Sequence, residues 1–311
     1  MRFQERDGRL LETIYDYDGL VARRHLKELF WPEATGRAME KRLSLLYHNG
    51  YLDWPDAAQR RSQPVAEPVV WLGWRGIAWL AGQWDAPVPV VDRPTETGLR
   101  RLECDLRREG IHWRREPRWN QMAHDLTIVD FRIAVQRAVD ELPGITLEEW
   151  VAEGVFWREP ETIRFAVTGS DGRTRQRTKS VRPDGVFVVV DTGRQSQGLP
   201  ARARFLLEVD NATHDNPRFG REKVAPGIAY LKSAVYKARF GEASGRWLVV
   251  TRGNARRLAN LMSQTRQTGG EEAGLFFFTT AEQAAAVNVL TAPIWLQTER
   301  TAPVALMAFR R

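Results

Sequence analysis

The chain lacks several features that define large protein classes. Its 311 residues include a single cysteine, Cys104, which excludes an intramolecular disulfide and a cysteine-rich zinc site. No apolar run approaches the roughly 18 residues of a membrane-spanning helix, and the first residues lack the apolar core of a signal peptide. These absences predict a protein of the reducing cytoplasm that has no membrane partner.

Short motifs of common enzyme classes are also absent. The sequence contains no phosphate-binding Walker loop, no Rossmann glycine fingerprint and no zincin motif. Apolar residues make up 43% of the chain, as in an ordinary globular protein. The length is sufficient for two domains, each with its own core.

Positive charge is concentrated in one part of the chain. The formal net charge is +7, and residues 164–239 contain 15 basic and 7 acidic side chains. Residues 173–179 alternate arginine or lysine with polar residues, which predicts a strand with one basic face. We expect Arg175, Arg177 and Lys179 to contact the phosphates of DNA, the predicted partner.

Residues 1–82 have the element order of a winged helix-turn-helix domain. Apolar spacing predicts helices over 5–17, 20–30 and 35–48, followed by two short strands, 51–54 and 69–72, around a polar tip. The third helix would be the recognition helix. The residues expected on DNA are those of its exposed face and of the wing tip, namely Arg37, Lys41, Arg42, Arg60 and Arg61. The alternative is a module for dimerisation or for docking onto replication or mobilisation proteins, because residues 1–90 contain 12 basic and 12 acidic side chains and so carry no net charge.

Residues 83–98 contain Pro87, Pro89 and Pro94 with little periodicity and are predicted to form a linker. Residues 99–311 then run through a long helix, several strands, and alternating helices and strands. This order is typical of an α/β domain in which helices flank a sheet. We predict strands over 151–157, 163–167 and 246–250, and a helix over 228–240. The fold class expected is therefore α/β within this domain and α+β for the whole chain.

Three acids lie at the ends of neighbouring apolar strands in this second domain. Asp184 precedes the run 186–190, and Glu208 and Asp210 lie at the end of the run 203–211. Residues two apart on a strand point to the same face. A buried carboxylate is costly unless something pairs with it, and converging carboxylates can hold a divalent cation. The alternative is that these acids pair with nearby arginines.

These residues resemble the signature of the PD-(D/E)XK nuclease fold, in which a Pro-Asp begins one strand and an acid-x-Lys lies on the next. The resemblance implies that Asp184 and Glu208 bind Mg²⁺ or Mn²⁺. Asp210 stands where that family usually has its lysine, and Lys223 is the nearest candidate for a lysine supplied by the following helix. The implied catalytic set is Asp184, Glu208, Asp210 and Lys223.

The whole chain resembles the replication-relaxation family of plasmid and mobile-element proteins. The resemblance rests on the order of short motifs: Trp71-Leu72-Gly73-Trp74 after the wing, His124-Asp125-Leu126 opening a long helix, Arg182-Pro183-Asp184, and Leu207-Glu208-Val209-Asp210. It implies association with DNA during plasmid replication or transfer. We interpret His124 as a helix cap or a core hydrogen-bonding residue in preference to a catalytic one.

The sequence thus predicts a DNA-binding protein of plasmid or mobile-element replication or transfer that has a nuclease-like domain. Two alternatives stay open for that domain. It is an active Mg²⁺-dependent endonuclease or nickase, or it is a fold without catalysis in a winged-helix regulator or scaffold. The survival of the acids favours the first alternative, and the acid at position 210 favours the second.

Overall fold

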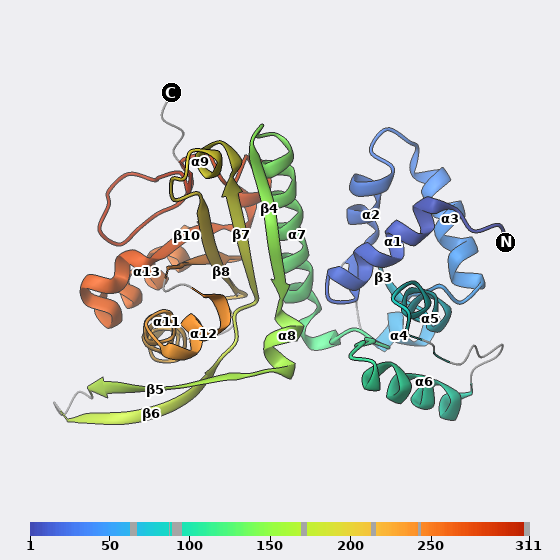
Figure 1. The fold of residues 1–311 in the computed structure, drawn as a ribbon, viewed down its shortest axis with the longest axis horizontal. Helices are drawn as coiled ribbons and strands as arrows, with labels where there is room; N and C mark the ends of the chain where they lie inside the picture. Colours follow the sequence, from blue (N-terminus) through green and yellow to red (C-terminus); the bar gives the residue numbers. More distant parts are fainter. Residues whose placement is uncertain are drawn as a thin grey trace. The chain divides into compact units, whose positions relative to one another are not determined.

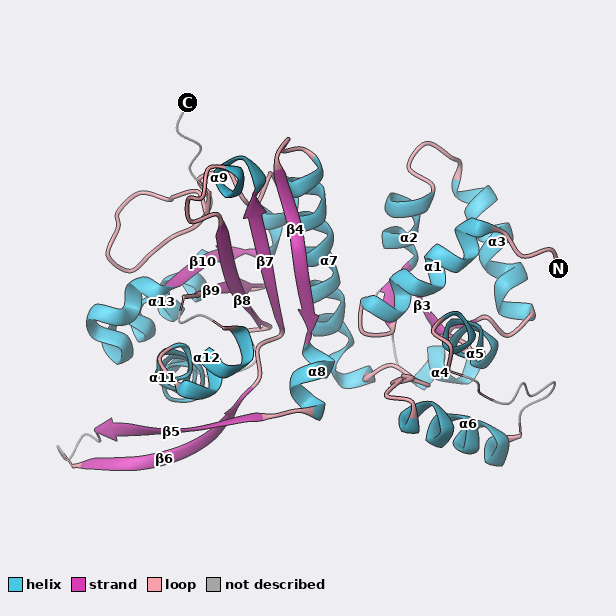
Figure 2. Ribbon diagram, viewed as in Figure 1, coloured by secondary structure: helices cyan, strands magenta, loops and turns pink. Residues whose placement is uncertain are grey.

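The computed structural model describes residues 1–62, 67–86, 88, 95–168, 173–212, 216–241 and 244–307. The fold is mixed α and β, as predicted (Figures 1 and 2). Its contacts divide the chain into two compact units, Met1–Val129 and Asp130–Arg311. Across the described ranges, no helix has the length and apolarity needed to cross a membrane.

The first unit packs its helices around a small sheet. The three strands follow the order β1-β3-β2, and both pairings are antiparallel. The helices are amphipathic, and their apolar side chains, such as Leu10, Leu43 and Ile77, are fully buried. The elements of this unit are α1 Glu5–Asp16, β1 Leu20–Ala22, α2 Arg23–Phe30, α3 Gly36–His48, β2 Leu52–Asp53, α4 Ala57–Ser62, β3 Val69–Leu72, α5 Trp74–Gln83, α6 Glu96–Arg108 and η1 Trp119–Gln121.

Two predicted elements of this unit need correction. The second helix begins at Arg23, because residues 20–22 pair with Val69–Trp71 as strand β1. The predicted tip between the strands contains the short helix α4. The pairing of Leu52 with Leu72 confirms the two strands around that tip.

Helix α6 falls in the first unit, whereas the sequence assigned residue 99 onward to the second domain. Within the predicted linker, residues 87 and 89–94 lie outside the described residues.

The second unit is built on a five-stranded mixed sheet in the order β10-β9-β8-β7-β4. β9 is parallel to both β8 and β10, whereas β7 is antiparallel to β8 and β4. The strands are β4 Ile145–Ala152, β7 Gly185–Asp191, β8 Arg202–Asp210, β9 Arg246–Thr251 and β10 Phe276–Thr280. A separate antiparallel ribbon consists of β5 Glu161–Thr168 and β6 Thr174–Val181.

Helices cover both faces of the sheet because alternate strand residues point to opposite sides. On one face, Phe187 meets Phe131 of α7, with ring centroids 6.2 Å apart. On the other face, Val186 and Leu206 share a core cluster with Ile228 and Leu258. The helices involved are α7 Met122–Asp140, α11 Ala225–Leu231, α12 Ala234–Phe240 and α13 Ala255–Gly269. Figure 1 shows α7 along β4, with α11, α12 and α13 beyond the opposite face.

Two further predictions are wrong in detail. The expected strand over 151–157 ends at Ala152, and Glu153–Arg158 forms helix α8. The expected single helix over 228–240 is two helices, because Ser233 accepts a hydrogen bond from the Tyr236 amide and caps α12. The remaining elements are α9 Thr192–Ser196, α10 Asn216–Phe219, η2 Gly220–Val224, η3 Gly270–Leu275 and α14 Ala281–Ala286.

Candidate metal and phosphate site

A pocket of about 380 Å³ opens in the second unit at the junction of the sheet, helix α8 and the ribbon. Three buried carboxylates line it, those of Glu153, Asp184 and Glu208. Lys223 lines it as well. The sequence predicted that Asp184, Glu208 and Lys223 belong to one site, and the structure brings these three together.

The local backbone explains where the two strand acids point. Asp184 immediately precedes β7, and its Oδ2 accepts a hydrogen bond of 2.6 Å from the amide of Val209 on β8. Its own amide donates to the carbonyl of Leu207 at 2.9 Å. Glu208 lies between these two β8 residues and is two residues from Leu206, so its side chain points to the face covered by α11. The strand pairing therefore fixes both carboxylates at the same end of two adjacent interior strands, β7 and β8.

Lys223 reaches the pocket from a π-helical turn, η2, between α10 and α11. Its Nζ lies 2.7 Å from both carboxylate oxygens of Glu208. Burial disfavours the charged ammonium, but the carboxylates of Glu208 and Asp184 more than offset this effect, so the pKa of Lys223 is raised. The side chain is therefore a fixed positive charge at neutral pH. π turns are rare and often lie at functional sites.

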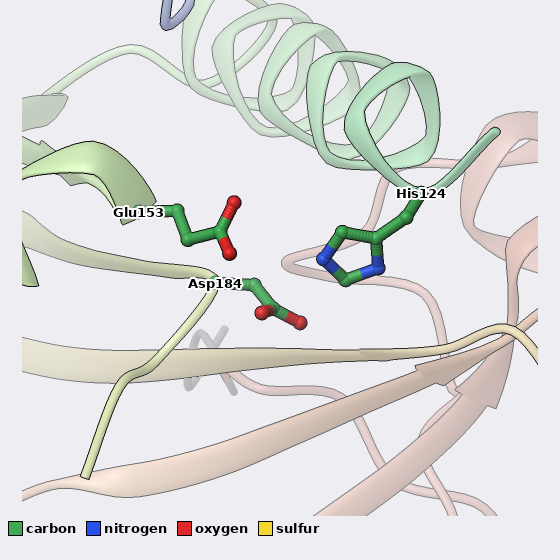
Figure 3. Close-up of side chains that lie close together, drawn as sticks. All are labelled: His124, Glu153 and Asp184. Atoms are coloured by element: carbon green, nitrogen blue, oxygen red, sulfur yellow. The ribbon is translucent and has the colours of Figure 1, made fainter. Parts of the chain in front are cut away.

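Glu153 is the acid that the sequence did not single out. It begins α8, and its Oε1 accepts a hydrogen bond of 2.8 Å from the indole N–H of Trp157 one turn later. Figure 3 shows its side chain facing Asp184, and His124 from the first turn of α7 points to the same place. One ligand atom from each of these three residues lies within 4.8 Å of the others.

Asp210 is on the same strand face as Glu208 but has different partners. Arg257 of α13 donates to both its carboxylate oxygens, at 2.7 and 2.9 Å. The Thr251 hydroxyl donates to the same carboxylate at 2.7 Å. Burial raises the pKa of Asp210, but the bonds from Arg257 and Thr251 lower it more, so the net direction is downward. Asp210 is absent from the lining of the acidic pocket.

Cations surround the acidic pocket. Lys179, Arg182 and Arg218 belong to its lining. Lys179 also donates to Glu222 at 2.7 Å and thereby lowers the pKa of that carboxyl. The cross-strand partners of Lys179, Arg177 and Arg175 are Ile163, Phe165 and Val167 respectively. Directly opposed residues share a sheet face, so these three cations lie on one face of the ribbon, as the alternation predicted.

The basic residues expected on DNA in the first unit have unequal roles. Arg37 and Lys41 on α3, and Arg60 and Arg61 on α4, are exposed. Arg42 instead donates from Nε to Asp7 Oδ1 at 2.7 Å and from Nη2 to the carbonyl of Arg2 at 3.0 Å. Arg42 therefore joins α3 to the start of α1.

Comparison with known proteins decides the family. The family model described as replication-relaxation matches residues 11–241, which include all three carboxylates and Lys223. The chain belongs to the replication-relaxation family. No curated protein and no solved structure matches it.

In this replication-relaxation protein, the sequence pattern did not indicate a role at the site for two residues, Glu153 and His124. Glu153 lay in a segment whose apolar residues, such as Val151 and Phe156, were interpreted as a strand. Helix α8 is only six residues long, so the sequence shows no helical period that would have indicated it. His124 was interpreted as a cap or core residue, yet Figure 3 shows it beside two acids.

Proposed function

We propose that the protein binds DNA during plasmid or mobile-element replication or transfer, and that its second unit cleaves a phosphodiester bond with the help of a divalent cation. One observation carries this proposal. Three buried carboxylates and one ammonium share a pocket that is also lined by Lys179, Arg182 and Arg218. Acids that hold a cation, surrounded by cations that hold phosphate, are what cleavage of a charged backbone requires.

The donor set fits Mg²⁺ or Mn²⁺. Carboxylate oxygens are the ligands that these cations prefer, and Glu153 and Asp184 offer oxygens within 4.8 Å of one another. Burying several acids side by side is unfavourable without a compensating positive charge. Glu153 and Asp184 would hold the cation, with Glu208 beside them. A bound cation would act as a Lewis acid on the phosphoryl group.

The remaining side chains would act on the substrate directly. The ammonium of Lys223, which the neighbouring carboxylates keep protonated, would stabilise negative charge that develops in the transition state. Arg182 and Arg218 would neutralise phosphate oxygens at the pocket. Asp210 would have a structural role, because Arg257 already binds both its oxygens.

The first unit supports a role in DNA binding through its element order. Helices α1, α2 and α3 precede the antiparallel strands β2 and β3, which is the order of a winged helix. In this proposal Arg37 and Lys41 contact DNA from α3, and Arg60 and Arg61 contact it from α4.

Two observations favour a second candidate, a DNA-binding scaffold without cleavage. Lys223 already forms an ion pair with Glu208, so this acid is neutralised without a metal. Asp210 stands in the usual position of the catalytic lysine and is bound to Arg257. Both features are expected of a nuclease fold that has retained its shape and lost its chemistry.

The deciding experiment is a nicking assay on supercoiled plasmid with Mg²⁺ or Mn²⁺. We expect nicking by the wild type and at least about 100-fold less by Asp184→Asn and Glu153→Gln, because loss of even an outer-shell partner of a metal costs 10- to 100-fold. The matched control is Glu148→Gln, which removes an exposed β4 acid paired with Arg202 and should nick normally. If the wild type cleaves with neither metal, the scaffold function replaces the nuclease.

A further inference from the structure

An exposed tryptophan stands at the acidic pocket. Trp157 lies in the last turn of α8 and belongs to the pocket lining, yet it is 49% exposed. Its indole N–H donates to Glu153, so the ring is held in place by one of the pocket acids. A half-exposed aromatic ring that is fixed beside the site offers a surface on which a planar group can stack.

Arg182 lies against this ring. Its guanidinium carbon is 4.1 Å from the Trp157 ring centroid, within the range of a cation–π interaction. Its Nε is buried and has no hydrogen-bond partner within the described ranges. A buried donor without a partner is costly, and a guanidinium fits a phosphate with two parallel hydrogen bonds. Arg182 also lines the acidic pocket, so its guanidinium is placed to bind a phosphate that enters the pocket.

We propose that Trp157 and Arg182 form a nucleotide-binding subsite that takes an unpaired base and its phosphate. This inference rests on the proposed function for the presence of DNA, and it adds the substrate class: single-stranded or frayed DNA. In a duplex both faces of a base are covered by neighbouring bases, so stacking on Trp157 requires a base that has left the helix. A pocket of about 380 Å³ is within the size range of small-ligand sites.

The subsite also links substrate binding to the acids. Trp157 contacts Glu153 through its N–H, and Arg182 is separated from Asp184 by Pro183 alone. A base stacked on the ring and a phosphate on the guanidinium would place the backbone of that nucleotide beside Glu153 and Asp184. The protein would then cleave where a strand is unpaired.

The test is DNA binding by the full-length protein in EDTA, so that it is independent of cleavage. The probes are a single-stranded oligonucleotide of about 12 nucleotides, within the span of known single-strand sites, that contains 2-aminopurine, and the same sequence as a duplex. We expect Trp157→Ala to weaken single-strand binding about tenfold, with duplex binding changed less than about twofold. The 2-aminopurine fluorescence should fall on binding to the wild type and fall less with the variant.

Three further variants separate the contributions. Trp157→Phe keeps a ring face and loses the bond to Glu153, so it should retain most of the single-strand affinity. Arg182→Met should lower both the single-strand affinity and the slope of its salt dependence, by about one unit. The matched control is Trp84→Ala in the first unit, which removes a tryptophan of similar exposure, 41%, and should behave as wild type.

Two outcomes would overturn this inference: unchanged single-strand affinity in Trp157→Ala, or an equal loss for single strand and duplex. Failure of the proposed function gives a different result. If the wild type never nicks plasmid but Trp157→Ala still loses single-strand binding selectively, the subsite is supported and the nuclease function is rejected.

Discussion

At the scale of single residues, Glu208 and Asp210 show how one strand face gives two acids different roles. They are two positions apart on β8, yet Glu208 meets Lys223 and Asp210 meets Arg257. The sequence predicted the shared face from the period of a strand. It could not predict the partners, because Arg257 comes from a helix 47 residues further along the chain.

Replacement of Asp210 should therefore affect stability more than chemistry. Asp210→Asn leaves the Arg257 guanidinium without its counter-charge in a mostly buried place, and we expect a loss of about 3 kcal/mol in the free energy of unfolding. The pKa of Asp210 is lowered in the fold. Its contribution is thus complete above the ordinary aspartate pKa of about 3.9 and is lost as the pH falls through the lowered value.

Urea unfolding of the wild type and the variant, at neutral pH and across the acidic range, checks this prediction. The stability difference should shrink as the pH falls. A double variant, Asp210→Asn with Arg257→Met, should lose less than the sum of the two single changes, because the pair acts as a unit. A single variant as stable as the wild type would contradict the assignment.

In contrast to Asp210, replacement of Lys223 should affect the cleavage rate. If the pocket cleaves DNA, Lys223→Ala should reduce the nicking rate at least about tenfold, about 1.4 kcal/mol, with little effect on DNA affinity. Because the pKa of Lys223 is raised, this side chain should add no inflection to the rate profile below the ordinary lysine pKa of about 10.4. Lys232→Ala is the control, since Lys232 pairs with Glu272 and is 60% exposed. Equal losses for both lysines would indicate general phosphate binding.

At the scale of secondary-structure elements, α3 combines two functions that the sequence treated as one. Arg37, Lys41 and Arg42 were all expected on DNA, but Arg42 bonds to the buried Asp7 of α1. The Asp7 carboxylate also accepts a hydrogen bond of 2.7 Å from the Gln4 amide and so completes the N-terminal cap of α1. The charge pattern of a helix alone does not show which cation reaches back to a neighbouring helix.

Arg42→Ala should thus destabilise the first unit. We expect a loss of about 3 kcal/mol, because Asp7 is left buried without its partner. Lys41→Ala, which changes the neighbouring exposed cation, should stay within about 0.5 kcal/mol of the wild type. Thermal unfolding of both variants measures the difference. Equal stability of the two variants would show that the Arg42–Asp7 pair contributes little.

Most elements were predictable from periodicity and turn residues, and the exceptions have local causes. β1 was interpreted as part of a helix because the apolar residues Leu20 and Val21 fit a helix as well as a strand. Only their pairing with β3 shows that they form a strand. Helix α8 was missed because it is six residues long, less than two turns. These short elements matter, since α8 supplies both Glu153 and Trp157 to the pocket.

At the scale of the whole molecule, both units carry exposed cations that can be tested together on one DNA. Affinity for DNA falls with salt, with a slope of about one unit for each phosphate contact. Arg37→Ala with Lys41→Ala removes two exposed charges from the first unit, and Arg175→Ala with Arg177→Ala removes two from the second. If both units contact the same DNA, each pair should lower the slope by about two units, and all four changes together should lower it by about four.

The control for this prediction is a third pair of arginines on α6. Arg101 and Arg108 are 81% and 77% exposed and are not expected on DNA. Their double replacement by alanine removes the same charge and should leave the slope almost unchanged. A reduction that matches the other pairs would mean that net charge alone sets the affinity. A reduction from only one of the two test pairs would assign DNA binding to that unit, and the other unit would then need a different partner.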